Sequence, residues 1–324
     1  MNFLRASIRQ VMGCIILVTA LAAQSQEFPS KPIRIISPFS AGSSTDLIAR
    51  VIGQKITENT GQQVIVDTRP GANGIIGVDL AAKAAPDGYT IVLASNGTHG
   101  INVSLFNKLP YDPVKDFAPV TQVGHVAYLL LTSNSAPFNS LQDLVAAAKA
   151  NPGRHTLGSA ASVAQLTGEL LKVTAGMNVS AVPYKTFAAA VTDLVNKQLD
   201  VHFEPIPSGL PLVKAGRLKA LAVTSASRSS LAPEVPTIAE AGYPGFESGA
   251  WVAFFAPAGT PKEVVVRLHA EIARALQSPD VREKLAQSGL EVVSSSPEQL
   301  AELVKTEIAK WAKLFKAANL PRQN

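Results

Sequence analysis

Short apolar segments alternate with helical patterns along most of the chain, and turns of small residues join them. Strands that alternate with helices indicate a largely parallel sheet flanked by helices. The expected strands cover residues 33–36, 63–67, 89–94, 128–132, 156–159, 181–184, 201–204, 218–225 and 251–255. The pattern therefore predicts an α/β fold.

The alternation is interrupted at residues 109–119, where three prolines mark a connection before a second alternating series. A chain of 324 residues is also too long for one ordinary core. We expect two lobes, each a mainly parallel sheet flanked by helices. Residues 26–124 and 231–324 are expected to form the first, residues 125–230 the second, with hinge crossings near 120–127 and 226–250. A cleft between hinged lobes is the expected ligand site.

Three of the strand-to-helix turns, at residues 39–46, 95–99 and 158–162, consist mainly of Gly, Ser, Thr, Ala and Asn. In an open parallel sheet, ligands bind beyond the carboxyl ends of the strands, where these turns must lie. The start of a helix offers unpaired backbone N–H groups and an electropositive end, which suits a carboxylate or phosphate. The alternative for any one turn is an ordinary capped helix. Two turns in one lobe and one in the other favour a cleft that holds a small anion.

The N-terminus resembles a cleavable export signal over residues 1–25. Arg5 and Arg9 precede an apolar run at residues 11–23, which ends in small residues suited to cleavage. Cys14 is the only cysteine and lies inside this segment. The mature protein is therefore expected in the periplasm, without disulfides or thiol chemistry.

Several classes of site have no support in the sequence. The net charge is only +5 and 6% of residues are aromatic, so we expect no nucleic-acid partner. Residues 39–46 lack the lysine of a P-loop and the spacing of a dinucleotide-binding turn, and no nucleophile elbow occurs. The five histidines show no metal-ligand spacing. We therefore expect no metal, no cofactor and no catalytic residue.

Three single residues have two interpretations each. His99 is either a ligand donor or a residue that stabilises its loop. Glu204, at the end of a strand, is either a specificity group or a carboxylate with partners inside the protein. Phe187 either flanks an organic ligand or packs in the core.

The order of motifs along residues 28–318 resembles the Bug family, the periplasmic receptors of tripartite tricarboxylate transporters. The matching motifs are FPSKPIRII (28–36), RPGANG (69–74), AKAAPDGYT (82–90), LPYDPVKDF (109–117), VPYK (182–185), PTIAEAG (236–242) and FAPAGTP (255–261). Where many members have Gly and a small residue after VPYK, this chain has Thr186 and Phe187, and where many have Asp it has Glu204.

The resemblance implies a two-lobed, Venus-flytrap fold of the type II periplasmic-binding-protein kind, without enzymatic activity. It implies that the loops grip a small organic acid, a mono- or dicarboxylate with an aromatic one among the options. We expect a monomer that delivers this acid to the membrane subunits of a tripartite tricarboxylate transporter. The expected ligand-binding residues are Phe39, Ser40, Ala41, Gly42, Ser43, Ser44, Thr45, Asp46, Asn96, Gly97, Thr98, His99, Ser159, Ala160, Ala161, Ser162, Phe187 and Glu204.

Two other functions remain open at this point. A sensor subunit would present its closed form to a signalling receptor instead of a transporter. An exported hydrolase would use the same cleft, but it would need a nucleophile–base pair, which has no recognisable spacing in the sequence.

Overall fold

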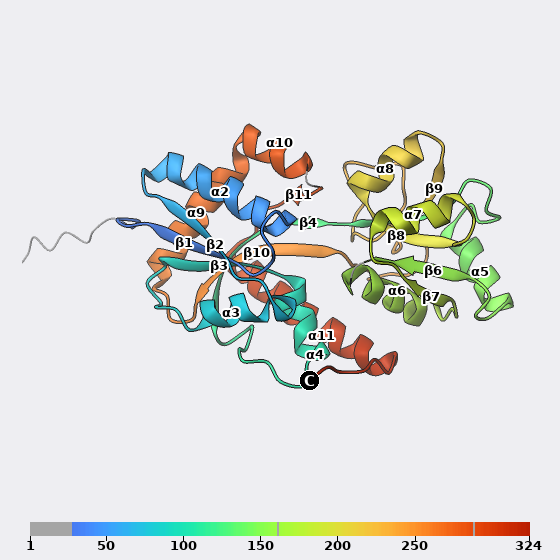
Figure 1. The fold of residues 1–324 in the computed structure, drawn as a ribbon, viewed down its shortest axis with the longest axis horizontal. Helices are drawn as coiled ribbons and strands as arrows, with labels where there is room; N and C mark the ends of the chain where they lie inside the picture. Colours follow the sequence, from blue (N-terminus) through green and yellow to red (C-terminus); the bar gives the residue numbers. More distant parts are fainter. Residues whose placement is uncertain (1–27, 161, 288) are drawn as a thin grey trace, which may run out of the picture.

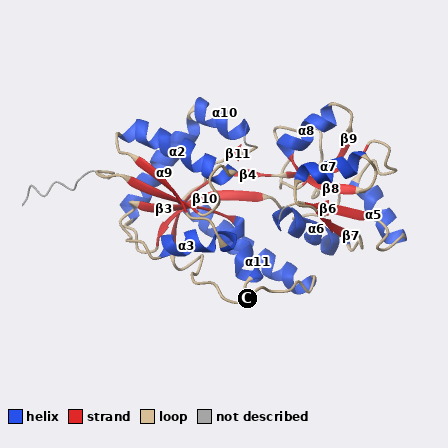
Figure 2. Cartoon of the chain, in the orientation of Figure 1, coloured by secondary structure: helices blue, strands red, loops and turns tan. Residues whose placement is uncertain are grey.

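The computed structural model describes residues 28–160, 162–287 and 289–324, so the expected export signal and Ala161 lie outside the described residues. Two sheets form two lobes that lie side by side along the long axis of the molecule (Figure 1). Helices cover both faces of each sheet (Figure 2). The predicted two-lobed α/β fold is confirmed.

The first lobe contains a six-stranded sheet with the strand order β11-β4-β10-β3-β1-β2. β1 pairs in parallel with β2 and β3, whereas β10 runs antiparallel to β3 and β4. Its strands are β1 (Ile33–Ser37), β2 (Val64–Thr68), β3 (Thr90–Ser95), β4 (Phe117–Val126), β10 (Ala250–Pro257) and β11 (Glu291–Val292). Its helical segments are α2 (Ser44–Thr60), η1 (Ala72–Gly74), α3 (Ile75–Ala82), η2 (Gly97–Ile101), α4 (Asn102–Leu105), α9 (Lys262–Gln277), α10 (Pro279–Gln287) and α11 (Pro297–Ala317).

The second lobe contains a five-stranded sheet with the order β7-β6-β8-β5-β9. β6 is parallel to β7 and β8, and β5 is antiparallel to β8 and β9. Its strands are β5 (Tyr128–Ser133), β6 (Thr156–Ser159), β7 (Ser180–Pro183), β8 (Val201–Pro205) and β9 (Leu218–Val223). Its helices are α5 (Leu141–Ala150), α6 (Ser162–Ala175), α7 (Phe187–Val195) and α8 (Ile206–Lys214). Both sheets contain reversed strands, but most strands of each share one direction. β10 and β11 run against the other four strands of the first lobe, and β5 runs against the other four of the second, which agrees with the expected mainly parallel sheets.

Alternation along β1 assigns its side chains to two cores. Ile33 and Ile35 pack with Ile52 and Ile272 under α2 and α9, whereas Ile36 packs on the other face with α3 and α11. Successive side chains of a strand point to opposite faces of the sheet, so both faces of this strand are apolar. The strand is therefore held on both sides, which fixes the position of the turn that follows it.

The chain passes between the lobes twice. On the outward path, β4 is followed directly by β5, with only Ala127 between them. On the return path, the segment 224–249 leads from β9 to β10. Val235 and Ile238 in this segment pack in cores of the second lobe. Core packing therefore places residues 232–246 with the second lobe, whereas the expected first-lobe segment starts at residue 231.

The two lobes share a small apolar cluster. Leu166 of α6 packs with Ile101, Trp311, Leu314 and Phe315 of the first lobe. The Trp311 indole is fully buried, and its Nε1 donates to Glu307 Oε2 at 2.9 Å. Figure 1 shows α6 beside α11 at this contact. This contact joins the lobes independently of the two connecting chain segments.

Replacing Trp311 by Ala is expected to lower the free energy of unfolding by about 3–5 kcal/mol, as for other buried Trp-to-Ala changes. Chemical denaturation measures this loss. Lys313→Ala changes an exposed position of the same helix and is the matched control, with an expected effect below about 0.5 kcal/mol. Equal stability of the two variants would contradict the packing role of Trp311.

Candidate functional site between the lobes

A cavity of about 460 Å³ lies between the lobes, where the connecting strands pass. The first lobe contributes the turns after β1, β2 and β3, and the second lobe contributes the starts of β5 and α6. The lining residues are Phe39, Ser43, Ser44, Thr45, Ile48, Asn73, Ser95, Asn96, Gly97, Ile101, Asn102, Leu105, Val126, Tyr128, Ser162, Val163, Ala250, Trp251, Val252 and Leu290.

The turn after β1 is a capped helix start with two unused donors. Ser43 is the N-cap of α2, and its hydroxyl accepts from the backbone N–H of Asp46 at 3.2 Å. Among the described residues, none accepts a hydrogen bond from the backbone N–H groups of Ser44 and Thr45. Both residues line the cavity, so the electropositive end of α2 presents free donors to it.

Asp46 acts inside this turn and does not line the cavity. Its carboxylate accepts from the Gly42 N–H at 3.0 Å, from Thr68 Oγ1 at 3.1 Å and from the Arg50 guanidinium at 3.0 and 3.1 Å. The hydrogen bonds from Arg50 are the main cause that lowers the pKa of this carboxyl. The structure therefore gives no support to ligand contact by Asp46. Its oxygens are already occupied, and they hold the turn in shape.

The first part of the same turn is not a donor surface for the cavity. Ser40, Ala41 and Gly42 are exposed and lie outside the lining. The Gly42 N–H is used by Asp46, and the Ser43 N–H donates to the Ser40 carbonyl at 3.1 Å. Of residues 39–46, the cavity therefore involves only Phe39 and the three residues 43–45.

The turn after β2 packs tightly against the other two. Gly74 has a φ of +85°, and a Cβ atom there would lie 2.7 Å from Thr98 Cγ2. Asn102 Nδ2 donates to the Asn73 carbonyl at 3.2 Å. The RPGANG motif thus places Asn73 at the edge of the cavity. The sequence did not predict a cavity residue in this turn. The glycines gave a signal of close backbone approach.

Only part of the turn after β3 reaches the cavity. Asn96 and Gly97 line it, and Asn96 Nδ2 donates to the Gly249 carbonyl on the return path at 2.7 Å. Thr98 is buried, and its Oγ1 donates to the Ser95 carbonyl at 3.0 Å. Thr98 therefore shapes the turn and does not line the cavity, contrary to expectation.

His99 lies in an aromatic cluster behind the cavity. Its ring stacks on Phe255 at 4.2 Å between centroids and lies 4.8 Å from Phe117. Its Nδ1 is 3.1 Å from Thr98 Oγ1, and burial lowers its pKa to about 3. Of its two interpretations, this position favours the loop-stabilising one and gives no support to ligand contact.

The connection at residues 109–117 supports this turn from behind. Tyr111 Oη donates to the Thr98 carbonyl at 2.8 Å, and burial raises the pKa of Tyr111 to about 12. The LPYDPVKDF motif therefore has a structural function, which is to fix the turn after β3 at the cavity.

In the second lobe, the residues at the cavity differ from those expected. Ser162, at the start of α6, and Tyr128 line it, whereas Ser159 and Ala160 do not. Phe187 stacks on Tyr128 at 6.4 Å and lies 5.9 Å from the His202 ring, outside the lining. The sequence did not single out Tyr128, although its place directly after the first crossing was a usable signal.

Glu204 is buried in a hydrogen-bonded group of the second lobe. Its Oε2 is 2.9 Å from His202 Nε2, and its Oε1 accepts from Ser208 Oγ. His202 Nδ1 lies 3.0 Å from the Gly158 carbonyl. Glu204 does not line the cavity, so the structural interpretation of this residue holds in the described conformation.

No side chain of Asp, Glu, His, Lys or Arg belongs to the described lining of the cavity. The described residues also contain no group of three or more His, Cys, Asp or Glu placed to hold a metal ion. An anion in this cavity would be held by neutral donors and by the N-terminal ends of α2 and α6.

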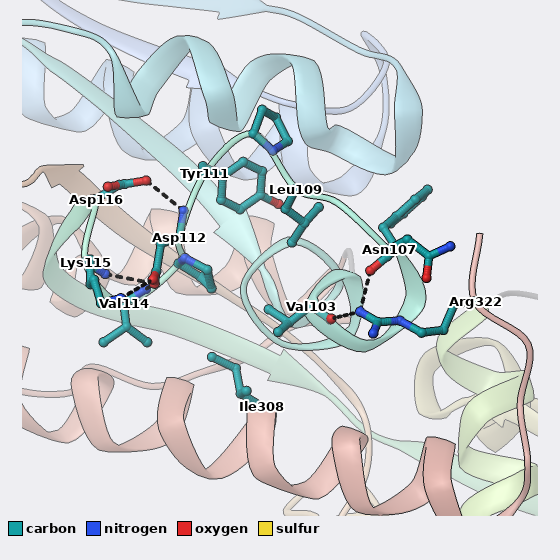
Figure 3. Close-up of a pocket in the computed structure, with 13 residues that line it drawn as sticks. Val103, Asn107, Leu109, Tyr111, Asp112, Val114, Lys115, Asp116, Ile308 and Arg322 are labelled. Atoms are coloured by element: carbon teal, nitrogen blue, oxygen red, sulfur yellow. Dashed lines mark hydrogen bonds and ion pairs between the residues drawn. The ribbon is translucent and has the colours of Figure 1, made fainter. Parts of the chain in front are cut away.

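A larger hollow of about 700 Å³ lies on the first lobe, between the 109–116 segment and Arg322 (Figure 3). Its charged groups are bonded to the protein itself. Arg322 donates to the Val103 and Phe106 carbonyls, and Asp112 Oδ1 accepts from two backbone N–H groups.

Among the described residues, no helix is both apolar enough and long enough to cross a membrane.

Two solved structures share the architecture. "R. palustris Rpa4515 with adipate" has a TM-score of 0.73 and 35% identity, covering 92% of this chain and 100% of that one. MatC (Rpa3494) from Rhodopseudomonas palustris with bound malate has a TM-score of 0.69 and 34% identity, covering 89% and 99%. The fold and the cavity define a two-lobed α/β binding protein.

The family model described as "Tripartite tricarboxylate transporter family receptor" matches residues 48–320. Protein BugT of Bordetella pertussis is 38% identical over 307 residues, which cover 93% of this chain and 94% of BugT. The chain therefore belongs to the tripartite tricarboxylate transporter receptor family, and the membership predicted from its motifs is confirmed. Members of this family are periplasmic solute-binding receptors.

Asp46→Asn is expected to lower the free energy of unfolding by about 1–3 kcal/mol at pH 7, because the turn loses hydrogen bonds to a charged group. The lowered pKa means that the stabilisation is fully present above the ordinary value of 3.8 and is lost as pH falls through the folded-state pKa. Denaturation at pH 7 and pH 3 measures both effects. Arg50→Gln, at a side chain 53% exposed, should lose less than about 1 kcal/mol. A loss for Asp46→Asn that is unchanged at pH 3 would contradict this role.

His99 should make the protein less stable in acid. The unfolded chain binds a proton below pH 6.5, whereas the buried ring binds one only near pH 3, so the stabilisation is complete above 6.5 and is lost between these values. His99 changes the free energy of unfolding by at most about 1.4 kcal/mol per pH unit between these values. His99→Phe keeps an aromatic ring and should remove this part of the slope in pH-dependent denaturation. Parallel pH profiles of the two proteins would refute the assignment.

Proposed function

We propose that this protein captures a small organic carboxylate in the inter-lobe cavity and delivers it to the membrane subunits of a tripartite tricarboxylate transporter. We further propose that it acts in the periplasm, as a monomer, after removal of residues 1–25. Family membership supports the transport role, and relatives with bound adipate and malate support the class of ligand.

The observation that carries the proposal is the pair of free N–H groups at Ser44 and Thr45. A carboxylate oxygen is the natural acceptor for such donors at a helix start, since charge-assisted hydrogen bonds are the stronger ones. Ser162 is at the start of α6 in the other lobe, so a ligand can contact both lobes at once.

Ligand contacts with both lobes couple binding to lobe closure. A ligand shifts a conformational equilibrium only by its differential affinity for the two states. An acid that touches α2 and α6 together gains contacts only when the lobes approach, so it favours the closed form. The segments β4–β5 and 224–249 are the proposed hinge, and the closed form is the proposed signal to the membrane partner.

The residues that line this cavity do not suit an enzymatic reaction such as hydrolysis. The serines in the described lining have no histidine, lysine or carboxylate beside them in that lining to act as a base. His99, the histidine of the candidate turns, packs against Phe255 behind the cavity. We therefore propose that the protein is a receptor without enzymatic activity.

Ser44→Pro tests the donor role directly. Pro at the first helical position is compatible with a helix, and Ser43 already has the extended backbone (φ −68°, ψ 161°) preferred before Pro. The variant thus lacks one N–H group while the helix remains. Affinity for the acid that the wild type binds best, among succinate, malate, adipate and benzoate, should fall about tenfold or more.

Ser44→Ala is the matched control, since it removes the hydroxyl and keeps the N–H group. It should retain most of the affinity in titration calorimetry and thermal-shift assays. Equal affinity of wild type and Ser44→Pro would overturn the role of this donor.

A further inference from the structure

The turns after β1 and β3 and the start of α4 present polar atoms of the first lobe to the cavity. They include the free N–H groups of Ser44 and Thr45 and the side chains of Asn96 and Asn102. Together these groups can donate hydrogen bonds to one carboxylate. The remaining walls have a different chemistry.

One apolar wall is the edge of the first lobe's core. Ile48, Val252 and Leu290 line the cavity and belong to the core under α2 and α9. They are 2%, 7% and 4% exposed, so the core fixes their positions. A ligand group that lies against them meets a fixed hydrocarbon surface.

A second apolar wall comes from the cluster that joins the lobes. Ile101 belongs to this cluster, and Leu105 and Val163 pack against it while also lining the cavity. Val163 lies on α6 and Leu105 on α4, so this wall contains residues of both lobes. Two apolar walls therefore come from two different cores.

Tyr128 of the second lobe and Trp251 on β10 of the first lobe carry neutral donor groups. Tyr128 lines the cavity, and burial together with the Glu204 carboxylate raises its pKa to about 12. The indole Nε1 of Trp251, which is 5% exposed, has no hydrogen-bond partner among the described residues. A neutral oxygen suits these groups, whereas the charge of Glu204 disfavours a second carboxylate near Tyr128.

The cavity also has room for more than a short diacid. A void of roughly 150 Å³ is enough to bind benzene. The inter-lobe cavity measures about 460 Å³, which leaves space for a ring beside the carboxylate.

We infer that the preferred ligand is a monocarboxylate with an apolar, ring-sized body. Its carboxylate binds at the start of α2, and its body lies between the walls around Ile48 and Val163. This inference rests on the proposed carboxylate-binding function and specifies its substrate class.

The experiment compares two sets of acids on the purified protein by thermal shift and titration calorimetry. Benzoate, phenylacetate and cyclohexanecarboxylate form the ring set, and succinate, malate and adipate form the diacid set. Benzamide tests the need for the charge. We expect at least one ring acid to bind tenfold or more tightly than every diacid, and benzamide not to bind. Tighter binding of a diacid would overturn the inference and leave the proposed function intact. Binding of no acid in either set would overturn both.

Val163→Thr tests the apolar wall at constant side-chain shape. This change should lower the affinity for the best ring acid about threefold to tenfold and should leave the affinity for diacids within twofold of the wild type. Val173→Thr makes the same change on the same helix at a position that is 43% exposed and outside the cavity, and it should leave both unchanged. An unchanged ring-acid affinity in Val163→Thr, with Val173→Thr also unchanged, would refute the placement of the ligand body.

Discussion

The site depends on the Asp46 carboxylate, which binds the backbone of its own turn. It accepts from the Gly42 N–H, from Thr68 and from Arg50, so one side chain links the turn to the neighbouring strand end and to the next turn of the helix. Asp46 uses the Gly42 N–H and the Ser40 carbonyl uses the Ser43 N–H, while the N–H groups of Ser44 and Thr45 remain free. The position of the free donors is therefore decided by an acidic residue that does not line the cavity.

Other residues around the cavity are also supported by charged or titratable groups that do not line it. Charged or titratable groups stand behind the residues that line it: Tyr111 and His99 support the turn after β3, and Glu204 lies behind Tyr128. The described lining itself is neutral. Helix ends can balance the charge of a bound acid without a salt bridge, so affinity can be adjusted by many weak donors instead of one strong ion pair.

The parts of this structure that could be predicted from sequence are those fixed by local chemistry. The alternation predicted the two lobes, and a capped helix was one of the two interpretations of the turn at residues 39–46, where Ser43 is the N-cap. The role of His99 could not be predicted, because Phe255, far along the chain, decides its burial. Helix α8 escaped prediction because its two prolines resemble a loop. The reversed directions of β5, β10 and β11 were also hidden, since patterning is the same for parallel and antiparallel strands that are buried on both faces.

The apolar contact between Leu166 and Trp311 has a thermal consequence. Any rotation that separates α6 from α11 exposes this surface to water, and exposure of apolar surface raises the heat capacity. The enthalpy of lobe separation therefore varies with temperature, and the apolar contact weakens on cooling. Lobe opening in this protein is thus coupled to temperature through a cluster that lies beside the ligand cavity, even when no ligand is bound.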